Sequence, residues 1–252
     1  MLLACDVGNS SVKLAIFDGD KRISFGLYPK NDFSSSTDIL SLTTKSNLRF
    51  DQFDAVYISS VVPQITEEIK NYVIENIKIN PTIIDNYSKL DITIDKEFKE
   101  NIGPDILVMS SYAYSKYKNE VLVVSLGTAT VFSFIDKKGV LKGCAIAPGF
   151  KSFSTSLSEK SALLPSFTPE YQENYLATNT VDAMSIGSYN GYIGMIKDLI
   201  SNITKEYNIV PKIVLCGGHS AKVKDHLSKI AYQENDFVIS GLNYLYLTKW
   251  KN

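Results

Sequence analysis

After its first residue the chain reads Leu2-Leu3-Ala4-Cys5-Asp6-Val7-Gly8-Asn9-Ser10-Ser11-Val12-Lys13, and a similar stretch follows as Val121-Leu122-Val123-Val124-Ser125-Leu126-Gly127-Thr128-Ala129-Thr130-Val131-Phe132. Each version is an apolar run, one polar residue, a glycine with polar and hydroxyl neighbours, and a second apolar run. This order predicts a strand, a tight turn and a second strand. Glycine lets a turn approach a bulky anion and can adopt positive φ, while hydroxyls and backbone N–H groups face the anion. Two such turns predict a clamp for a phosphate chain.

The two versions differ in charge. Asp6 ends the first apolar run, and Ser125 stands at the equivalent position of the second. A hydroxyl can coordinate a cation, but it supplies no charge to offset the desolvation of that cation. The predicted clamp is therefore asymmetric.

The bulk composition excludes some classes of function. The 252 residues are 44% hydrophobic and 21% charged, which is ordinary for a soluble globular protein with one large or two smaller domains. The net charge of −1 argues against a surface for nucleic acid, so we expect a small-molecule substrate. Arg22 and Arg49 are the only arginines, and bidentate arginine contacts to phosphate or carboxylate are therefore scarce.

The sequence shows no signal for export or membrane insertion. No run approaches the roughly 18 apolar residues of a membrane helix, and Asp6 comes too early for a signal peptide. Cys5, Cys144 and Cys216 are widely spaced, which fits reduced thiols better than a disulfide framework. We therefore expect a cytoplasmic protein that does not bind membranes.

Hydrophobic periodicity predicts a similar order of elements in both halves. The first half is expected to hold strands at 1–17 and 21–28 in one meander, strands at 55–60 and 81–84, and helices at 37–46, 63–75 and 103–117. The second half is expected to hold strands at 121–125, 130–136, 139–147 and 212–216, and helices at 151–164, 180–204, 220–231 and from about 241. The repeat predicts two packed α/β domains, 1–118 and 119–252, with a cleft between them.

Three glycines interrupt the helix expected at 180–204, namely Gly187, Gly191 and Gly194. Glycine costs stability in a helix interior, so a packing reason is expected for them. We expect close packing against another backbone, and a subunit partner is a good candidate.

A third glycine turn, Cys216-Gly217-Gly218-His219, comes directly after a strand and before a helix. Three turns at strand ends resemble the nucleotide site of the actin-like superfamily of sugar kinases and chaperone ATPases. The resemblance implies an α/β fold of two related actin-like (ribonuclease H-like) domains with a nucleotide cleft between them. In that superfamily the first two turns hold phosphates, and the third lies against adenosine.

Within that superfamily the motifs resemble one family, the type III pantothenate kinases. They run in family order across nearly the whole chain: Asp6-Val7-Gly8-Asn9-Ser10, Ser59-Ser60-Val61-Val62-Pro63, Gly103-Pro104-Asp105, Gly127-Thr128-Ala129-Thr130, residues 143–149, Asn179-Thr180-Val181, Gly187, Gly217-Gly218 and Gly241-Leu242. The first motif is weak by itself, whereas the ordered set is specific. The resemblance implies ATP-dependent phosphorylation of pantothenate, the first step of coenzyme A biosynthesis, in a homodimer.

The resemblance also implies roles for particular residues. Asp105 would be the general base that accepts the proton of the pantothenate hydroxyl, Asp6 would hold Mg²⁺, and a monovalent cation (K⁺ or NH₄⁺) would lie at Ser125. ATP would contact Asp6, Val7, Gly8, Asn9, Ser10, Ser11, Val12, Lys13, Gly127, Thr128, Gly217 and Gly218. Pantothenate would contact Gly103, Pro104, Asp105, Ile106 and Thr180. Phosphoryl transfer requires charge neutralisation, alignment and a nearby base, which these residue types can supply.

The position of Asp105 also has a simpler explanation. A carboxylate in the first turn of a helix is favoured by the helix dipole without any catalytic role. The lysine at position 13 likewise has two readings, as a phosphate contact or as a solvated strand lysine.

Three departures from the family pattern fall at or near positions that the family uses for binding or catalysis. The family has aspartate where this chain has Ser125, arginine where it has Ile106, and an aromatic-Asn-Pro segment where it has residues 95–100. An isoleucine cannot pair with an anionic substrate group as an arginine does. Two other functions therefore stay open: a catalytically impaired homologue acting as a binding or regulatory protein, and a kinase of another small hydroxyl substrate.

Overall fold

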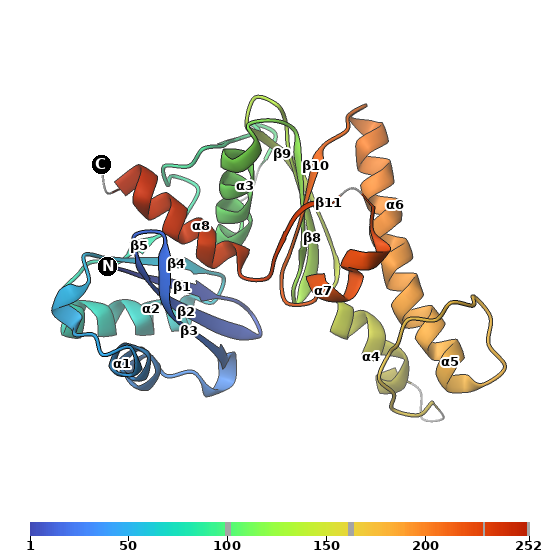
Figure 1. Cartoon of the computed structure of the whole chain (residues 1–252), viewed down its shortest axis with the longest axis horizontal. Helices are drawn as coiled ribbons and strands as arrows, with labels where there is room; N and C mark the ends of the chain where they lie inside the picture. The colour runs from blue at the N-terminus through green and yellow to red at the C-terminus, as the bar shows by residue number, and fades with distance from the viewer. Residues whose placement is uncertain (99–101, 161–163, 229, 251–252) are drawn as a thin grey trace. The chain divides into compact units, whose positions relative to one another are not determined.

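The computed structural model describes residues 1–98, 102–160, 164–228 and 230–250, which form two compact units (Figure 1). Unit 1 comprises Met1–Lys118, Gly139–Leu141 and the chain from Asp236, and unit 2 comprises Asn119–Lys138 and Lys142–Asn235. Among the described residues, no helix has both the length and the apolar character that crossing a bilayer requires. Parts of three expected features lie outside the described residues: 99–100 of the segment 95–100, 161–163 of the helix 151–164, and 229 of the helix 220–231.

The sheet of unit 1 has the strand order β3-β2-β1-β4-β5. Its strands are β1 (Leu2–Val7), β2 (Ser11–Asp18), β3 (Lys21–Pro29), β4 (Ala55–Ser60) and β5 (Thr82–Ile83). β1, β2 and β3 are antiparallel neighbours, whereas β4 runs parallel to β1 and β5 parallel to β4. The expected meander and the two single strands are confirmed.

Within the described ranges the second sheet has six strands, and five neighbouring ones repeat this order as β9-β8-β7-β10-β11, with β6 (Thr93–Ile94) next to β9. These five strands are β7 (Val121–Leu126), β8 (Ala129–Ile135), β9 (Val140–Pro148), β10 (Lys212–Cys216) and β11 (Ile230–Glu234). β7 and β8 are antiparallel, while β10 runs parallel to β7 and β11 parallel to β10. β1 and β7 also share one burial pattern, in which only the fifth residue is half-buried. The internal repeat in the sequence is thus a repeat of topology and of burial.

Four helices and a short strand complete unit 1 in the part of the chain that the structure describes. The helices are α1 (Ser35–Lys45), α2 (Pro63–Tyr72), α3 (Pro104–Tyr117) and α8 (Phe237–Leu245), with π-helical turns at Val73–Ile77 and Tyr246–Trp250 and 3₁₀ turns at Lys30–Asp32 and Phe50–Gln52. Prolines occupy the first positions of α2 and α3, where a missing N–H costs nothing. The strand β6 (Thr93–Ile94) pairs with Val140 and Leu141 of the same unit.

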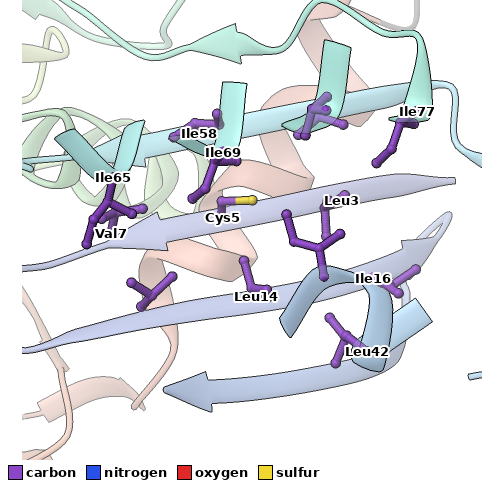
Figure 2. Packing of buried hydrophobic residues seen from close by; sticks show 14 of the residues in the cluster. Leu3, Cys5, Val7, Leu14, Ile16, Leu42, Ile58, Ile65, Ile69 and Ile77 are labelled. Atoms are coloured by element: carbon purple, nitrogen blue, oxygen red, sulfur yellow. The ribbon is translucent and has the colours of Figure 1, made fainter. Parts of the chain in front are cut away.

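The core of unit 1 lies between its sheet and the helices α1 and α2 (Figure 2). Leu3, Cys5 and Val7 of β1 point into this core, where they meet Ile65 and Ile69 of α2. Since side chains alternate along a strand, the even-numbered residues of β1 face the opposite side of the sheet. α3 and α8 pack on that opposite side.

Unit 2 contains α4 (Phe150–Lys160), α5 (Thr180–Ser185), α6 (Gly191–Glu206) and α7 (Ser220–Val223), with a π-helical turn at Ile186–Asn190 and a 3₁₀ turn at Lys224–His226. The helix expected at 180–204 is therefore interrupted by a π turn. A Cβ added to Gly187 or Gly194 would meet no other part of the described chain within 4 Å, and one on Gly191 would meet only the ring of Phe153 at 3.7 Å. The described chain thus contains no backbone packed closely on these glycines, and a subunit partner remains a prediction.

The prediction of a helix at 220–231 is wrong in its second half. Helical structure ends at His226, and the chain then forms β11, which pairs in parallel with β10. Pairing at a sheet edge overrides the local helical preference of this segment. The last helix begins at Phe237 instead of near 241.

α8 belongs to unit 1, although it follows unit 2 in sequence. It packs on β1, β2, β4 and α3. A Cβ on Gly241 would lie 2.6 Å from Val108 Cγ1, so the helix approaches α3 closely at this glycine. The units separate at Lys118 and Asn119, where the sequence predicts the domain boundary, and the chain from Asp236 groups with unit 1. The division of the chain into domains 1–118 and 119–252 stays a prediction.

Asp91 connects α8 and the turn after it to the rest of unit 1. Its Oδ2 accepts a hydrogen bond of 2.6 Å from Tyr244 Oη, and its Oδ1 lies 2.9 Å from Lys249 Nζ and 3.4 Å from Lys118 Nζ. Burial raises the pKa of Asp91, but the hydrogen bonds from Tyr244 and Lys249 and the charges of both lysines outweigh it. The pKa of Asp91 therefore lies below its ordinary value.

Asp91→Asn is expected to lower the free energy of unfolding at pH 7 by about 1–3 kcal/mol, because it weakens three charge-assisted contacts of a largely buried carboxylate. A depressed pKa contributes stability above the unfolded-state value of about 3.9, and this stability is lost as the pH falls through the folded-state value. Urea unfolding at pH 7 and pH 3 should show a smaller difference at pH 3. Asp51→Asn, which removes an exposed ion pair with Arg49, is the control and should change little. Equal losses in the two variants would contradict the prediction.

Candidate functional site

Asp6 lies near the C-terminal end of β1 in unit 1, on the side of the sheet that carries α3 and α8. It lies beside Lys13 of β2 and Ser59 of β4 in the strand register, and its side chain is 15% exposed. Ser59 is fully buried, and its hydroxyl has no hydrogen-bond partner among the described residues. A carboxylate and an unsatisfied hydroxyl therefore occupy neighbouring positions on the side of the sheet that carries α3 and α8.

The first glycine turn connects β1 to β2. The N–H of Gly8 donates to the carbonyl of Ser11 at 2.9 Å, and Asn9 and Ser10 are exposed. Val7 and Val12 are buried in the core, so only their backbone can reach a ligand. Gly8 does not use the positive φ that glycine can adopt. The lack of a side chain, and not an unusual conformation, is what glycine contributes here.

The pKa of Asp6 is raised to about 6. Burial is the largest cause, and the negative charges of Asp105 and Asp236 raise the pKa further. Lys13 acts in the opposite direction, with its Nζ 4.0 Å from Asp6 Oδ2. Lys13 Nζ also lies 3.4 Å from Asp236 Oδ1, so the ammonium group of Lys13 lies between the carboxylates of Asp6 and Asp236.

Asp105 lies in the first turn of α3, after Gly103 and Pro104. Burial raises the pKa of Asp105, and hydrogen bonds from the backbone N–H groups of Ile106 and of Asp105 itself oppose this rise. A Cβ on Gly103 would lie 2.6 Å from Asp105 Oδ1, so the glycine leaves room for the carboxylate. A buried carboxylate with a raised pKa is a better proton acceptor than an exposed one. The side chain of Ile106 is buried.

Asp236 was not predicted from the sequence. It stands directly before α8, and its Oδ1 lies 3.4 Å from Lys13 Nζ. Its Oδ2 accepts a hydrogen bond of 3.2 Å from Arg22 Nη1. The sequence signal that could have found it is a lone aspartate before an apolar helix, which by itself predicts only a helix cap. Lys13 is therefore ion-paired and only 19% exposed, not a solvated strand lysine.

The second glycine turn lies in unit 2, between β7 and β8. Ser125 is half-buried at the position equivalent to Asp6, and the N–H of Gly127 donates to the carbonyl of Ala129 at 3.0 Å. Gly149 packs against this turn so closely that a Cβ would lie less than 3.0 Å from the carbonyl oxygen of Thr128. Gly127 also lacks positive φ, so this turn, like the first, uses the absence of a side chain.

The third turn lies next to the second. Gly217 has φ +90°, and a Cβ there would lie 2.6 Å from the carbonyl oxygen of Leu126. The N–H of His219 donates to the same carbonyl at 3.0 Å, and Gly218 is exposed. His219 is half-buried against the ring of Phe150, and burial together with Lys222 lowers its pKa. Unit 2 thus brings two of the three predicted glycine turns into direct contact.

Thr180 is the first residue of α5, after the helix cap Asn179. Its side chain is exposed, and it lines a cavity of about 500 Å³ together with Thr178, Ala183 and Met184. The described contacts do not join it to Asp105 or to the glycine turns, so its role as a substrate contact stays a prediction.

The donor set in unit 1 fits Mg²⁺. Mg²⁺ in kinase sites usually takes one or two carboxylates and completes its shell with phosphate oxygens and water. Among the described residues, no three acidic, histidine or cysteine side chains form a closed metal cage. Asp6, with the unsatisfied hydroxyl of Ser59 beside it, matches a site that relies on the nucleotide for its other ligands. Ser125 offers only a neutral oxygen to a cation.

Comparison with known proteins places these features in one family. The family model described as type III pantothenate kinase matches residues 2–202. The type III pantothenate kinase of Geobacter sulfurreducens is 30% identical over 251 residues, which cover 98% of both chains. That of Agathobacter rectalis is 30% identical as well, over 98% of this chain and 96% of its own.

Solved structures support the fold. A Campylobacter jejuni protein described as a Baf family transcriptional activator matches with a TM-score of 0.62 at 18% identity, over 97% of this chain and 96% of its own. A Sinorhizobium meliloti protein described as a 2-dehydro-3-deoxygalactonokinase matches with a TM-score of 0.61 at 12% identity, over 100% and 98%. The predicted α/β class, of the actin-like ATPase and sugar kinase type, is confirmed.

Proposed function

The chain belongs to the type III pantothenate kinase family, and we propose that it transfers the terminal phosphoryl group of ATP to the hydroxyl of pantothenate, the first step of coenzyme A biosynthesis. The observation that carries the proposal is that Asp6, beside the first glycine turn, and the buried Asp105, in the first turn of α3, both belong to unit 1, where α3 packs on β4, the strand that pairs with β1. Phosphoryl transfer needs a proton acceptor at the attacking hydroxyl close to the group that organises the phosphates.

Each residue has a defined task in this proposal. Asp105 accepts the proton of the pantothenate hydroxyl as that oxygen attacks phosphorus, and Gly103 leaves the space that the carboxylate needs. The first turn offers backbone and hydroxyl groups to phosphate oxygens, with Lys13 as a positive charge beside it. Asp6 would hold Mg²⁺, which neutralises phosphate charge when it is bound. In unit 2, Gly127, Thr128, Gly217 and Gly218 would contact ATP.

The experiment is a turnover assay on the purified protein. With ATP, Mg²⁺, a potassium or ammonium salt and pantothenate, we expect ADP and phosphopantothenate in equal amounts, measured by a coupled assay and by mass spectrometry. Reactions without pantothenate measure background hydrolysis of ATP. ADP release no greater than that of an Asp105→Asn variant would contradict the proposal.

The departures at Ser125 and Ile106 favour two other candidate functions, which the same assay distinguishes. MgATP binding without turnover would favour a catalytically impaired homologue that acts as a binding or regulatory protein. Activity that appears only in the double variant Ser125→Asp and Ile106→Arg would identify a lapsed kinase. ADP release with a hydroxyl compound that lacks a carboxylate, and not with pantothenate, would indicate another substrate.

We further propose a cytoplasmic homodimer that uses K⁺ or NH₄⁺ at Ser125. Exposed apolar side chains support the dimer: Tyr175, Leu176 and Val181 lie close together in sequence before and within α5, and Leu176 is 91% exposed. Sedimentation of the purified protein measures its oligomeric state, and replacement of K⁺ by Na⁺ in the turnover assay tests the cation.

A further inference from the structure

Four charged side chains of unit 1 lie in a row, in the order Arg22, Asp236, Lys13 and Asp6. The two oxygens of Asp236 have different partners: Oδ1 lies 3.4 Å from Lys13 Nζ, and Oδ2 accepts from Arg22 Nη1 at 3.2 Å. Lys13 Nζ lies in turn 4.0 Å from Asp6 Oδ2. The side chains of Asp6, Lys13 and Asp236 are 15%, 19% and 22% exposed, so water screens these charges only in part.

The backbone positions of Lys13 and Asp236 are fixed by the fold. Lys13 is a strand residue paired with Asp6, and Asp236 directly precedes α8, which packs on β1, β2 and β4. Arg22 is further held by the ring of Phe25, with Cζ 4.9 Å from the ring centroid. The flexible part is the side chain of Lys13, whose four-carbon stem has many rotamers in solution.

The side chain of Asp236 does not cap the helix that it precedes. It occupies the N-cap position of α8, where aspartate normally accepts a hydrogen bond from a backbone N–H of the first turn. Its side chain makes no such bond. The carboxylate is directed to Lys13 and Arg22 instead, so the helix forgoes a cap that would stabilise it.

We propose that Asp236 is a positioning residue that holds the ammonium group of Lys13 beside Asp6, where the phosphates of ATP bind. This inference rests on the proposed function, since it assigns MgATP to the first turn. Arg22 neutralises part of the charge of Asp236, so that Asp236 directs Lys13 without repelling the nucleotide strongly. Lys13 then meets the phosphates in one orientation and loses less rotamer freedom on binding.

Asp236→Asn separates positioning from simple electrostatics, because the two effects have opposite signs. Removal of a negative charge near a polyanion site by itself tightens MgATP binding. Loss of positioning weakens it, and we expect the dissociation constant of MgATP to rise about tenfold, as for the loss of one oriented charged contact. Asp236→Glu, which keeps the charge, should recover most of the affinity. Unchanged or tighter binding by Asp236→Asn would overturn the proposal.

The Lys13→Met background provides the matched control. If Asp236 acts through Lys13, Asp236→Asn should change MgATP affinity less than about twofold once the ammonium group is gone. A loss of about tenfold in both backgrounds would show a structural effect of Asp236 and would overturn the proposal. In the turnover assay, KM for ATP should rise and KM for pantothenate should stay the same. If Asp236→Asn does not fold, as judged by circular dichroism, Asp236→Ser, which keeps a residue suited to the start of a helix, replaces it in both backgrounds with the same expected losses.

Calorimetric titration with MgATP makes the two proposals separable, because it needs no turnover. If Asp236→Asn weakens MgATP binding in the wild-type background and not in the Lys13→Met background, but pantothenate is not phosphorylated, the proposed function is contradicted and the positioning role stands. Turnover of pantothenate together with additive effects of the two substitutions would contradict the positioning role alone. A wild-type chain that binds no MgATP would overturn both.

Discussion

Asp105→Asn is expected to lower kcat for pantothenate phosphorylation by about 100- to 10,000-fold, the range that a general base contributes. The asparagine keeps the size of the side chain and an oxygen that can accept the backbone hydrogen bonds of the α3 N-terminus. It cannot accept the proton of the attacking hydroxyl. MgATP affinity should change little, and a steady-state assay with the variant at high enzyme concentration measures the residual rate.

Stability measurements distinguish this role from that of a helix-terminal carboxylate. Burial raises the pKa of Asp105, so the charged form is disfavoured in the folded state, and that cost is present at neutral pH. The uncharged asparagine should therefore leave the melting temperature unchanged or higher. A variant with nearly full kcat and a lower melting temperature would show that Asp105 serves the helix and not the reaction.

The same raised pKa sets the acidic side of the pH–rate profile. A general base acts only when it is deprotonated, so kcat/KM falls as the pH drops through the pKa of Asp105. This fall should occur above the ordinary aspartate value of about 3.9. The pKa of Asp6 also lies at about 6, so the profile reports both carboxylates, and Asp105→Asn should remove one of the two slopes from the remaining activity.

Gly149→Val is expected to abolish tight MgATP binding and to lower the free energy of unfolding by about 1–3 kcal/mol or more. The new Cβ would lie less than 3.0 Å from the carbonyl oxygens of both Thr128 and Gly127. Both are backbone atoms of the second turn, so no side-chain rotation relieves the overlap. The turn itself must move, and it takes the predicted phosphate contacts with it.

Gly143 offers a matched control in β9, the strand that ends directly before Gly149, since a Cβ there would meet no other part of the described chain within 4 Å. Gly143→Val should bind MgATP and unfold like the wild-type chain. Calorimetry with MgATP and thermal unfolding of the two variants give the comparison. If both variants lose affinity equally, the effect arises from valine in this part of the chain in general, and the close contact of Gly149 with the second turn is not what matters.

The repeated strand–turn–strand pattern predicts much of the fold. Local periodicity is strong in both stretches, and the two sheets follow with one strand order and one burial pattern. Prediction failed where long-range pairing decides the structure. Residues 230–234 become a strand because β10 offers an edge, and nothing within that segment carries this information.

The candidate site divides in the same way. Asp6, Asp105 and the glycine turns stand in local motifs, so the sequence points to them. Asp236 lies near the C-terminal end of the sequence. Its neighbour in space, Lys13, lies near the N-terminal end, and the whole sequence of unit 2 comes between them. The departures at Ser125 and Ile106 are visible in the sequence, but their effect on turnover depends on chemistry that only the assay measures.

The place of α8 in unit 1 has a consequence for synthesis. A nascent chain emerges from the ribosome N-terminus first, so β1 and β4 are made long before the helix that covers them. Until α8 emerges, the face with Leu2, Ala4 and Tyr57, which are at most 2% exposed in the finished protein, has no cover from it. Unit 2 is complete in sequence before that moment. The unit that is begun first is therefore finished last, and its open apolar face is what a chaperone would protect during translation.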